Sequence, residues 1–191
     1  TRGKLLIMPK LTIMNIPGSG EGATGKLTVE KTTTGTVTLP QNADKVEVTV
    51  ESGRTATEPV VIAYSEESGA SKASEVIIKA DNAEVENLTI SLPESHVELN
   101  GVKVKTLTAS TSANTLVIGT DTEVETLDVQ QGNVEIRGKV GSVKKADGCS
   151  INWFVGDKTS FNEAYEKGAD VLTLTADIVD FSSVILLGRT V

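Results

Sequence analysis

Three consecutive segments of the chain can be aligned with one another, and this internal repeat most constrains what the chain can fold into. Each segment contains Val-x-x-Leu, beginning at Val85, Val104 and Val124, and a weaker copy begins at Val140. The starts lie 19 residues (85 to 104), 20 residues (104 to 124) and 16 residues (124 to 140) apart. Strand-sized units that recur at such intervals are typical of a chain that coils and stacks on itself.

A second apolar column runs through the same region. It reads Val97-Glu98-Leu99, Leu116-Val117-Ile118 and Val134-Glu135-Ile136. Residues that accept left-handed backbone angles, such as Gly101 and Gly132, separate these pieces and allow sharp turns. The sequence therefore predicts an all-β parallel solenoid with coils of about 19 residues.

The repeat also predicts which side chains point inward. Six residues should form two stacked apolar columns: Val85, Leu88, Val104, Leu107, Val124 and Leu127. The positions beside them are polar and should form ladders: Asn87, Thr106, Thr126 and Ser142 in one, and Glu86, Lys105 and Glu125 in the other. At a strand spacing of about 4.8 Å the alternating charges of the second ladder attract one another.

A leucine-rich repeat is the nearest alternative solenoid, because Val85-x-x-Leu88-x-Ile90 imitates its core pattern. That fold needs Asn or Cys three residues after the last apolar position. Here those positions are Pro93, Ser112 and Gly132, and the second apolar column is foreign to that fold.

The chain divides into three parts: an N-terminal strand and linker segment at 1–35, the solenoid at 36–150, and residues 151–191. The apolar runs 5–8 and 11–14 precede a linker rich in Pro, Gly and Ser at 17–22. Residues 48–50 match residues 88–90 at an offset of 40, which suggests two turns of about 20 residues. In the third part we expect a short capping helix near 160–167, capped by Thr159 and Ser160 and ended by Gly168, and then strands at 171–174 and 184–187.

The segment Phe161-x-x-Ala164-Tyr165-x-x-Gly168-Ala169-Asp170-Val171-Leu172 resembles the entry into pectate-lyase-like right-handed parallel β-helices of bacterial surface proteins. The resemblance covers about residues 159–191, and the repeat at 75–145 is consistent with it. It implies a right-handed coil and an exported protein, secreted or on the cell surface. Because the chain begins at Thr1 and stops directly after an apolar strand, we expect it to be processed and to be part of a longer protein.

The same resemblance bears on catalysis. Members that cleave polysaccharides hold calcium with acids from neighbouring coils and remove a sugar proton with a basic residue. Here Val117 separates Glu98 from Glu135, and Lys105 separates Glu86 from Glu125, so no catalytic residue carries over. We expect a non-catalytic binding or adhesion module, with glycans as its ligands. The alternatives are a non-catalytic part of a longer polysaccharide lyase or hydrolase, and a purely structural stalk.

Composition excludes several partners and cofactors. A net charge of −8 leaves no basic stripe for nucleic acid, and no run reaches the roughly 18 apolar residues of a membrane span. The single Cys149 excludes an intrachain disulfide and a multi-cysteine zinc site, and it lacks an adjacent base, so we expect a small packed residue. The only histidine, His96, is expected in an exposed loop. We expect no cofactor.

Two groups of residues are candidate sites. Asp121, Glu123 and Asp128 crowd one turn and are weak candidates for calcium, although they lack the glycine and terminal acid of a dedicated loop, so a solvated acidic face is our preferred interpretation.

Aromatic residues gather between 153 and 165, in a chain with only 3% aromatics. Our preferred interpretation is that they pack the capping helix onto the solenoid. The alternative is a saccharide site built from Trp153, Asn152, Asp157 and Tyr165, in which Trp153 stacks on a sugar ring and can be replaced without loss of the fold.

Overall fold

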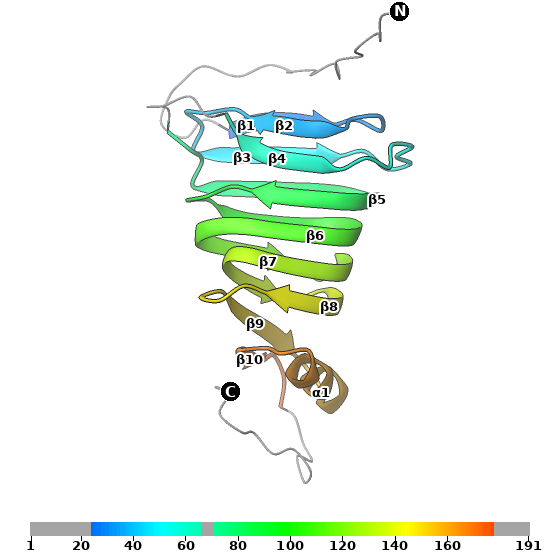
Figure 1. Ribbon diagram of the computed structural model, residues 1–191, viewed down its shortest axis with the longest axis vertical. Coiled ribbons are helices and arrows are strands. Elements are labelled where there is room, and N and C mark those ends of the chain that lie inside the picture. The colour runs from blue at the N-terminus through cyan, green and yellow to red at the C-terminus, as the bar shows by residue number, and fades with distance from the viewer. Residues whose placement is uncertain (1–23, 66–70, 178–191) are drawn as a thin grey trace, which may run out of the picture.

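The computed structural model describes residues 24–65 and 71–177, which form a stack of coils with β1 at one end and β10 and α1 at the other (Figure 1). The first five strands are β1 (Thr24–Val29), β2 (Gly35–Leu39), β3 (Lys45–Val50), β4 (Val60–Tyr64) and β5 (Glu75–Ser91). They are followed by β6 (His96–Ile118), β7 (Glu123–Ile136), β8 (Lys139–Lys145), β9 (Ser150–Val155), α1 (Lys158–Glu166) and β10 (Val171–Leu174).

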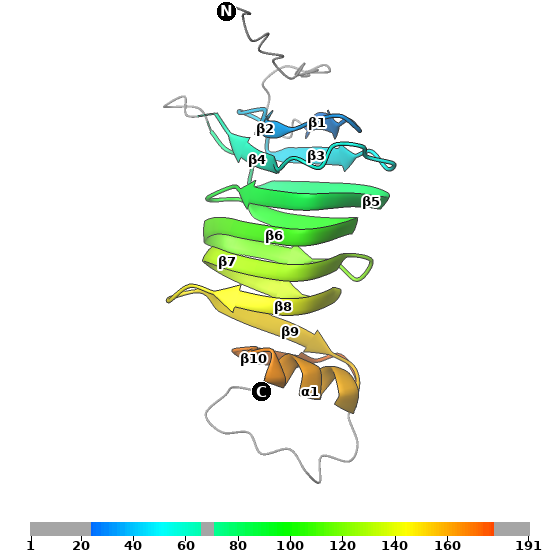
Figure 2. The ribbon, with the colours of Figure 1, turned by 45° about the vertical axis from the view of Figure 1, so that its right-hand side comes forward.

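All strand pairs are parallel, and together they make a parallel β-solenoid of about 7 turns with a spacing of about 20 residues. One wall runs from β1 through β3 and the first halves of β5 and β6, and then through the last residues of β6 and the second half of β7 to β9 and β10. The opposite wall runs from β2 through β4 and the second half of β5 to β6, β7 and β8. Figure 2 shows the coils stacked on one another. Strands on both walls exclude the leucine-rich repeat.

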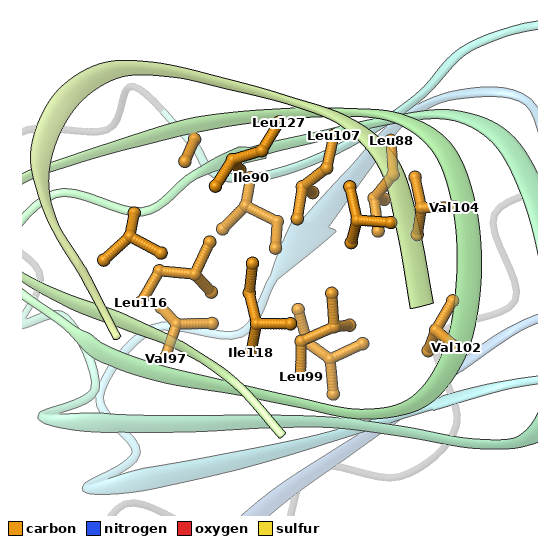
Figure 3. Packing of buried hydrophobic residues seen from close by; sticks show 14 of the residues in the cluster. Leu88, Ile90, Val97, Leu99, Val102, Val104, Leu107, Leu116, Ile118 and Leu127 are labelled. Carbon is orange, nitrogen blue, oxygen red and sulfur yellow. The ribbon is translucent and has the colours of Figure 1, made fainter. Parts of the chain in front are cut away.

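The core lies between the two walls, and the predicted apolar columns are confirmed. Val85, Val104, Val124 and Val140 are in register from coil to coil, as are Leu88, Leu107, Leu127 and Val143. All six residues predicted to point inward are buried, with at most 5% of each exposed. Figure 3 shows Leu88, Leu107 and Leu127 on one side of this core and Leu99 and Ile118 on the other. Stacks of β-branched and leucine side chains supply the burial that the scarce aromatics do not.

The predicted ladder of amide and hydroxyl side chains is confirmed, and one of the two predicted contacts of the charged ladder is formed. Asn87, Thr106, Thr126 and Ser142 are successive register partners, and the Ser142 hydroxyl lies 3.2 Å from the Thr126 hydroxyl. In the charged ladder, Lys105 Nζ donates to Glu86 Oε1 at 3.2 Å. Outward charges therefore stabilise one another between coils without any ligand.

One expectation about the early coils is corrected by the pairing. Val48 pairs with Ile78 on the first wall, whereas Leu88 pairs with Val60 on the second, so the offset of 40 aligned strands from opposite walls. Strand β1 already pairs with β3, and β9 and β10 continue the same wall, so the parallel pairing extends on both sides of 36–150. The insertion between β3 and β4 disturbs the 20-residue interval that a repeat search needs.

The helix lies where it was expected, but its cap was assigned wrongly. The N-cap is Asp157, whose side chain accepts from the Ser160 amide, while the Ser160 hydroxyl bonds back to the Asp157 amide. Gly168 follows the helix with φ of 90°, and β10 matches the predicted strand 171–174. The expected elements at 5–8, 11–14 and 184–187 lie outside the described residues.

Gly101 closes a corner that no other residue can occupy without strain. Its φ is +70°, and an added Cβ would collide with the carbonyl oxygen of Ala80 in the preceding coil. We expect Gly101→Ala to lower the free energy of unfolding by about 2–4 kcal/mol in a denaturant titration. Gly148→Ala is the matched control, since φ is +82° there but a Cβ meets nothing within 4 Å. Equal losses at the two positions would show that the contact with Ala80 is unimportant.

Candidate functional site

The two neighbouring aromatic residues of β9 lie on opposite sides of the first wall. Trp153 is the register partner of Ile136 and points into the core, with 7% of the residue exposed. Phe154 points outward, and the Arg137 guanidinium lies 4.7 Å from the centre of its ring. This burial favours the packing interpretation for Trp153. Because side chains alternate along a strand, Phe154 is the aromatic residue on the outer side of β9. The sequence analysis did not select Phe154 for the candidate site, although this alternation could have identified it.

The other three residues of the aromatic candidate site have separate contacts. The Asn152 side chain accepts from the Thr173 hydroxyl at 2.8 Å on the outer side of the first wall. Asp157 caps α1, and Tyr165 is half-buried and packs against the core. The structure therefore does not gather the four residues around one exposed aromatic ring. Saccharide binding at 152–165 stays a prediction.

The cap of α1 makes a testable contribution to stability. Hydrogen bonds from the Ser160 amide and then the Ser160 hydroxyl lower the pKa of Asp157. In the unfolded chain the pKa of an Asp carboxyl is about 3.9. Because the pKa of Asp157 is lower in the folded protein, its carboxylate stabilises the fold at pH values above about 3.9. This stabilisation is lost as the pH falls through the pKa of the folded state. We expect Asp157→Ala to lower the Tm at pH 7 and the difference from wild type to shrink at pH 2–3. Asp157→Asn, which keeps an acceptor, should melt closer to wild type, and a pH-independent difference would contradict this account.

The three acids considered for calcium are also spread apart. Glu123 accepts a hydrogen bond from Lys139 Nζ at 3.1 Å, and this bond and the Lys139 charge lower the pKa of Glu123. Asp128 is paired in register with Thr108 and Lys144 on the second wall, and Asp121 is exposed in the turn before β7. Within residues 24–65 and 71–177, no group of three His, Cys, Asp or Glu side chains could hold a metal ion.

We expect metal removal to leave stability unchanged. The carboxylate of Glu123 already has an ammonium partner, so adding a chelator should not move the Tm beyond error in a thermal melt. A drop in Tm that added calcium reverses would contradict this prediction and reopen the assignment of Asp121, Glu123 and Asp128.

The remaining titratable candidates lie within the scaffold. Cys149 is half-buried and packs against the core. His96 is half-buried at the start of β6, where its backbone amide donates to Ser74, so it belongs to a strand and not to the exposed loop that was expected.

A groove of about 560 Å³ lies on the short face that joins the two walls, and we call it the corner groove. Its size is within the usual range for a ligand site. Val85, Val104 and Val124 lie at its base, and the charged residues on either side of them line it. These residues come from four successive coils, at 84–86, 103–105, 123–125 and 139–141.

The loop between β3 and β4 forms one end of the corner groove through Arg54, Ala56 and Thr57. In Figure 1 this loop projects beyond the edge of β5. Arg54 holds it in place, since its two terminal nitrogens donate to the carbonyl oxygens of Glu30 at 2.8 Å and Thr33 at 2.6 Å. Burial lowers the pKa of the Arg54 guanidinium, and its Nε is buried without a hydrogen-bond partner among the described residues.

The charges of the corner groove alternate in sign from coil to coil. The first column is Glu84, Lys103, Glu123 and Lys139, all register partners. The second column is Glu86, Lys105, Glu125 and Gly141. Each coil thus presents one sign, and the next coil presents the other. The arrangement offers hydrogen-bond donors and acceptors at the strand spacing of about 4.8 Å, and it places no two carboxylate rows on adjacent coils.

The two charged columns could be predicted from the sequence, whereas the groove could not. The second column was identified from the repeat, and the first follows from the same alignment. The loop at 51–59 gave no signal of its role, because only the stacking of the coils brings it beside residues 84–86.

A comparison of the chain with protein-family models, with curated proteins and with solved structures found no match. The class of protein is therefore defined by its fold alone, a parallel β-solenoid with a polar groove on its short face. No helix in the described part of the chain is long and apolar enough to cross a membrane.

Proposed function

We propose that the chain is a non-catalytic, exported bacterial binding or adhesion module that holds a glycan in the corner groove. The observation that carries this proposal is the groove itself, which displays hydrogen-bonding side chains from four coils of a rigid scaffold. Sites are commonly placed where an irregular loop meets such a scaffold, as the loop at 51–59 does here. Export, and membership of the pectate-lyase-like right-handed superfamily, are part of this proposal and rest on the resemblance of residues 159–191.

The chemistry of the corner groove supports binding over cleavage. Its acids alternate with lysines along the stack, and two of them, Glu86 and Glu123, are hydrogen-bonded to Lys105 and Lys139. The hydrogen bond from Lys139 and its charge lower the pKa of Glu123, which makes this carboxylate a poor candidate for a general acid near neutral pH.

A glycan array probed with the purified chain tests the proposal. We expect binding to linear glycans that is weakened at least about fivefold by Lys103→Met, since Lys103 lies in the middle of the groove. Lys26→Met is the matched control, because it removes the same charge from an exposed position on β1. Absence of binding to every glycan would favour the stalk, and release of unsaturated sugar ends from a bound glycan would favour the lyase.

A further inference from the structure

We infer that the ligand of the corner groove is a linear glycan that carries both carboxylate and ammonium groups. This inference rests on the proposed function and specifies its ligand class. It depends on three observations. The charges of the groove cancel, three of the charged side chains form no hydrogen bond or ion pair within the described residues, and the sign of the charge changes at every coil.

The cancellation disfavours a ligand of one charge. Four basic and four acidic side chains line the groove: Arg54, Lys103, Lys105 and Lys139, and Glu84, Glu86, Glu123 and Glu125. A polyanion would meet two rows of glutamates and a chain with a net charge of −8, and a polycation would meet the lysine rows. Like charges brought together at an interface cost binding energy, so neither class fits the whole groove.

The unpartnered charges disfavour a ligand without charge. The side chains of Lys103, Glu84 and Glu125 form no hydrogen bond or ion pair within the described part of the chain. After the larger effects of the Lys139 hydrogen bond and charge, the Lys103 charge also contributes to lowering the pKa of Glu123. A neutral glycan would displace water from these groups and offer them only weak partners, which costs free energy. Carboxylates beside Lys103 and ammonium groups beside Glu84 and Glu125 would replace the lost hydration with charge-assisted hydrogen bonds.

The spacing of the rows favours a sugar chain in particular. Adjacent coils lie about 4.8 Å apart, close to the length of one hexose in an extended chain, so charges on alternating sugars can follow charges on alternating coils. An extended peptide usually binds a sheet by pairing with its free edge. The backbone at 103–105 and 123–125 is paired on both sides with the neighbouring coils, so in the middle of the groove only side chains remain to recognise a ligand.

One polysaccharide backbone in four charge states provides the test. Heparosan alternates glucuronate with N-acetylglucosamine; N-deacetylation adds ammonium groups, and carboxyl reduction removes the acids. We expect the N-deacetylated, unreduced form to bind at least about tenfold more tightly than the acid-only, amine-only and neutral forms, with an affinity that falls as salt rises.

Two outcomes would overturn the inference and leave glycan binding intact. In the first, the neutral form binds most tightly and its affinity does not depend on salt. In the second, a form with charges of one sign binds most tightly. Binding of no form, together with a negative glycan array, would overturn both.

One lysine variant and one glutamate variant test whether the glycan binds in the corner groove. Lys103→Met and Glu125→Gln should each weaken binding of the doubly charged glycan about five- to tenfold, because each removes one sign of the pattern. Lys26→Met and Glu166→Gln remove the same charges from exposed positions outside the groove and should leave binding unchanged. Binding that survives both groove variants would reject this location, and selective binding of a mixed-charge peptide instead of the glycan would reject the ligand class. Circular dichroism of each variant checks that the fold is kept.

Discussion

Replacing Trp153 by alanine should lower the free energy of unfolding by about 3–5 kcal/mol, the usual cost of truncating a buried large aromatic side chain. The ring lies in the core beside the helix-bearing coil, and only 7% of the residue is exposed. Lys167 Nζ lies 5.7 Å from the ring centre and donates to the Val140 carbonyl, which closes this end of the core. Urea titration of both proteins measures the difference.

Phe154→Ala is the matched control, because it truncates the adjacent aromatic on the outer side of the same strand. Its ring contacts Arg137 and is only partly buried, so the loss should be clearly smaller, about 1 kcal/mol. A Trp153→Ala protein as stable as wild type would mean that this side chain does not pack in the core, and it would restore the possibility that Trp153 stacks on a sugar.

Leu107→Ala should cost about 2–5 kcal/mol, since it opens a cavity in the middle of the stack. Leu107 is fully buried and lies between Leu88 and Leu127 in the coils on either side. A solenoid is stabilised by contacts between neighbouring coils, so loss of one central contact should weaken both adjoining interfaces. Differential scanning calorimetry measures the effect.

Thr108→Ala serves as the control for Leu107→Ala. Thr108 is the next residue along β6 and points outward, so its truncation should change stability by no more than about 0.5 kcal/mol. Similar losses in the two variants would contradict the register in which Leu107 faces the core.

The regular coils were predictable because their side chains obey two periods at once. Alternation along each strand decides that Val104 points inward and Lys105 outward, and the repeat of about 20 residues decides that Lys105 lies beside Glu86. The early coils obey only the first period. Their inward residues, such as Val48, could be predicted, whereas their partners could not, because the loops between their strands differ in length.

The cap of α1 was misassigned for a similar local reason. Asp157, Thr159 and Ser160 can all cap a helix, and the sequence does not rank them. The extended backbone of Asp157, with φ of −151° and ψ of 172°, decides in its favour, since an N-cap residue lies outside the helix in such a conformation. Ser160 then completes the capping box from within the helix.

The sequence by itself determined that this chain is a parallel solenoid, which residues of its regular coils face the core, and that charges of opposite sign meet between coils. These features follow from periodic patterns that any stacked arrangement must satisfy. Only the tertiary structure decided which side of β9 meets the core, so that Trp153 is buried and Phe154 only partly buried, and that Arg54 holds a loop beside residues 84–86 to form the corner groove. An insertion has no period, so its position depends on where the coils on either side place it.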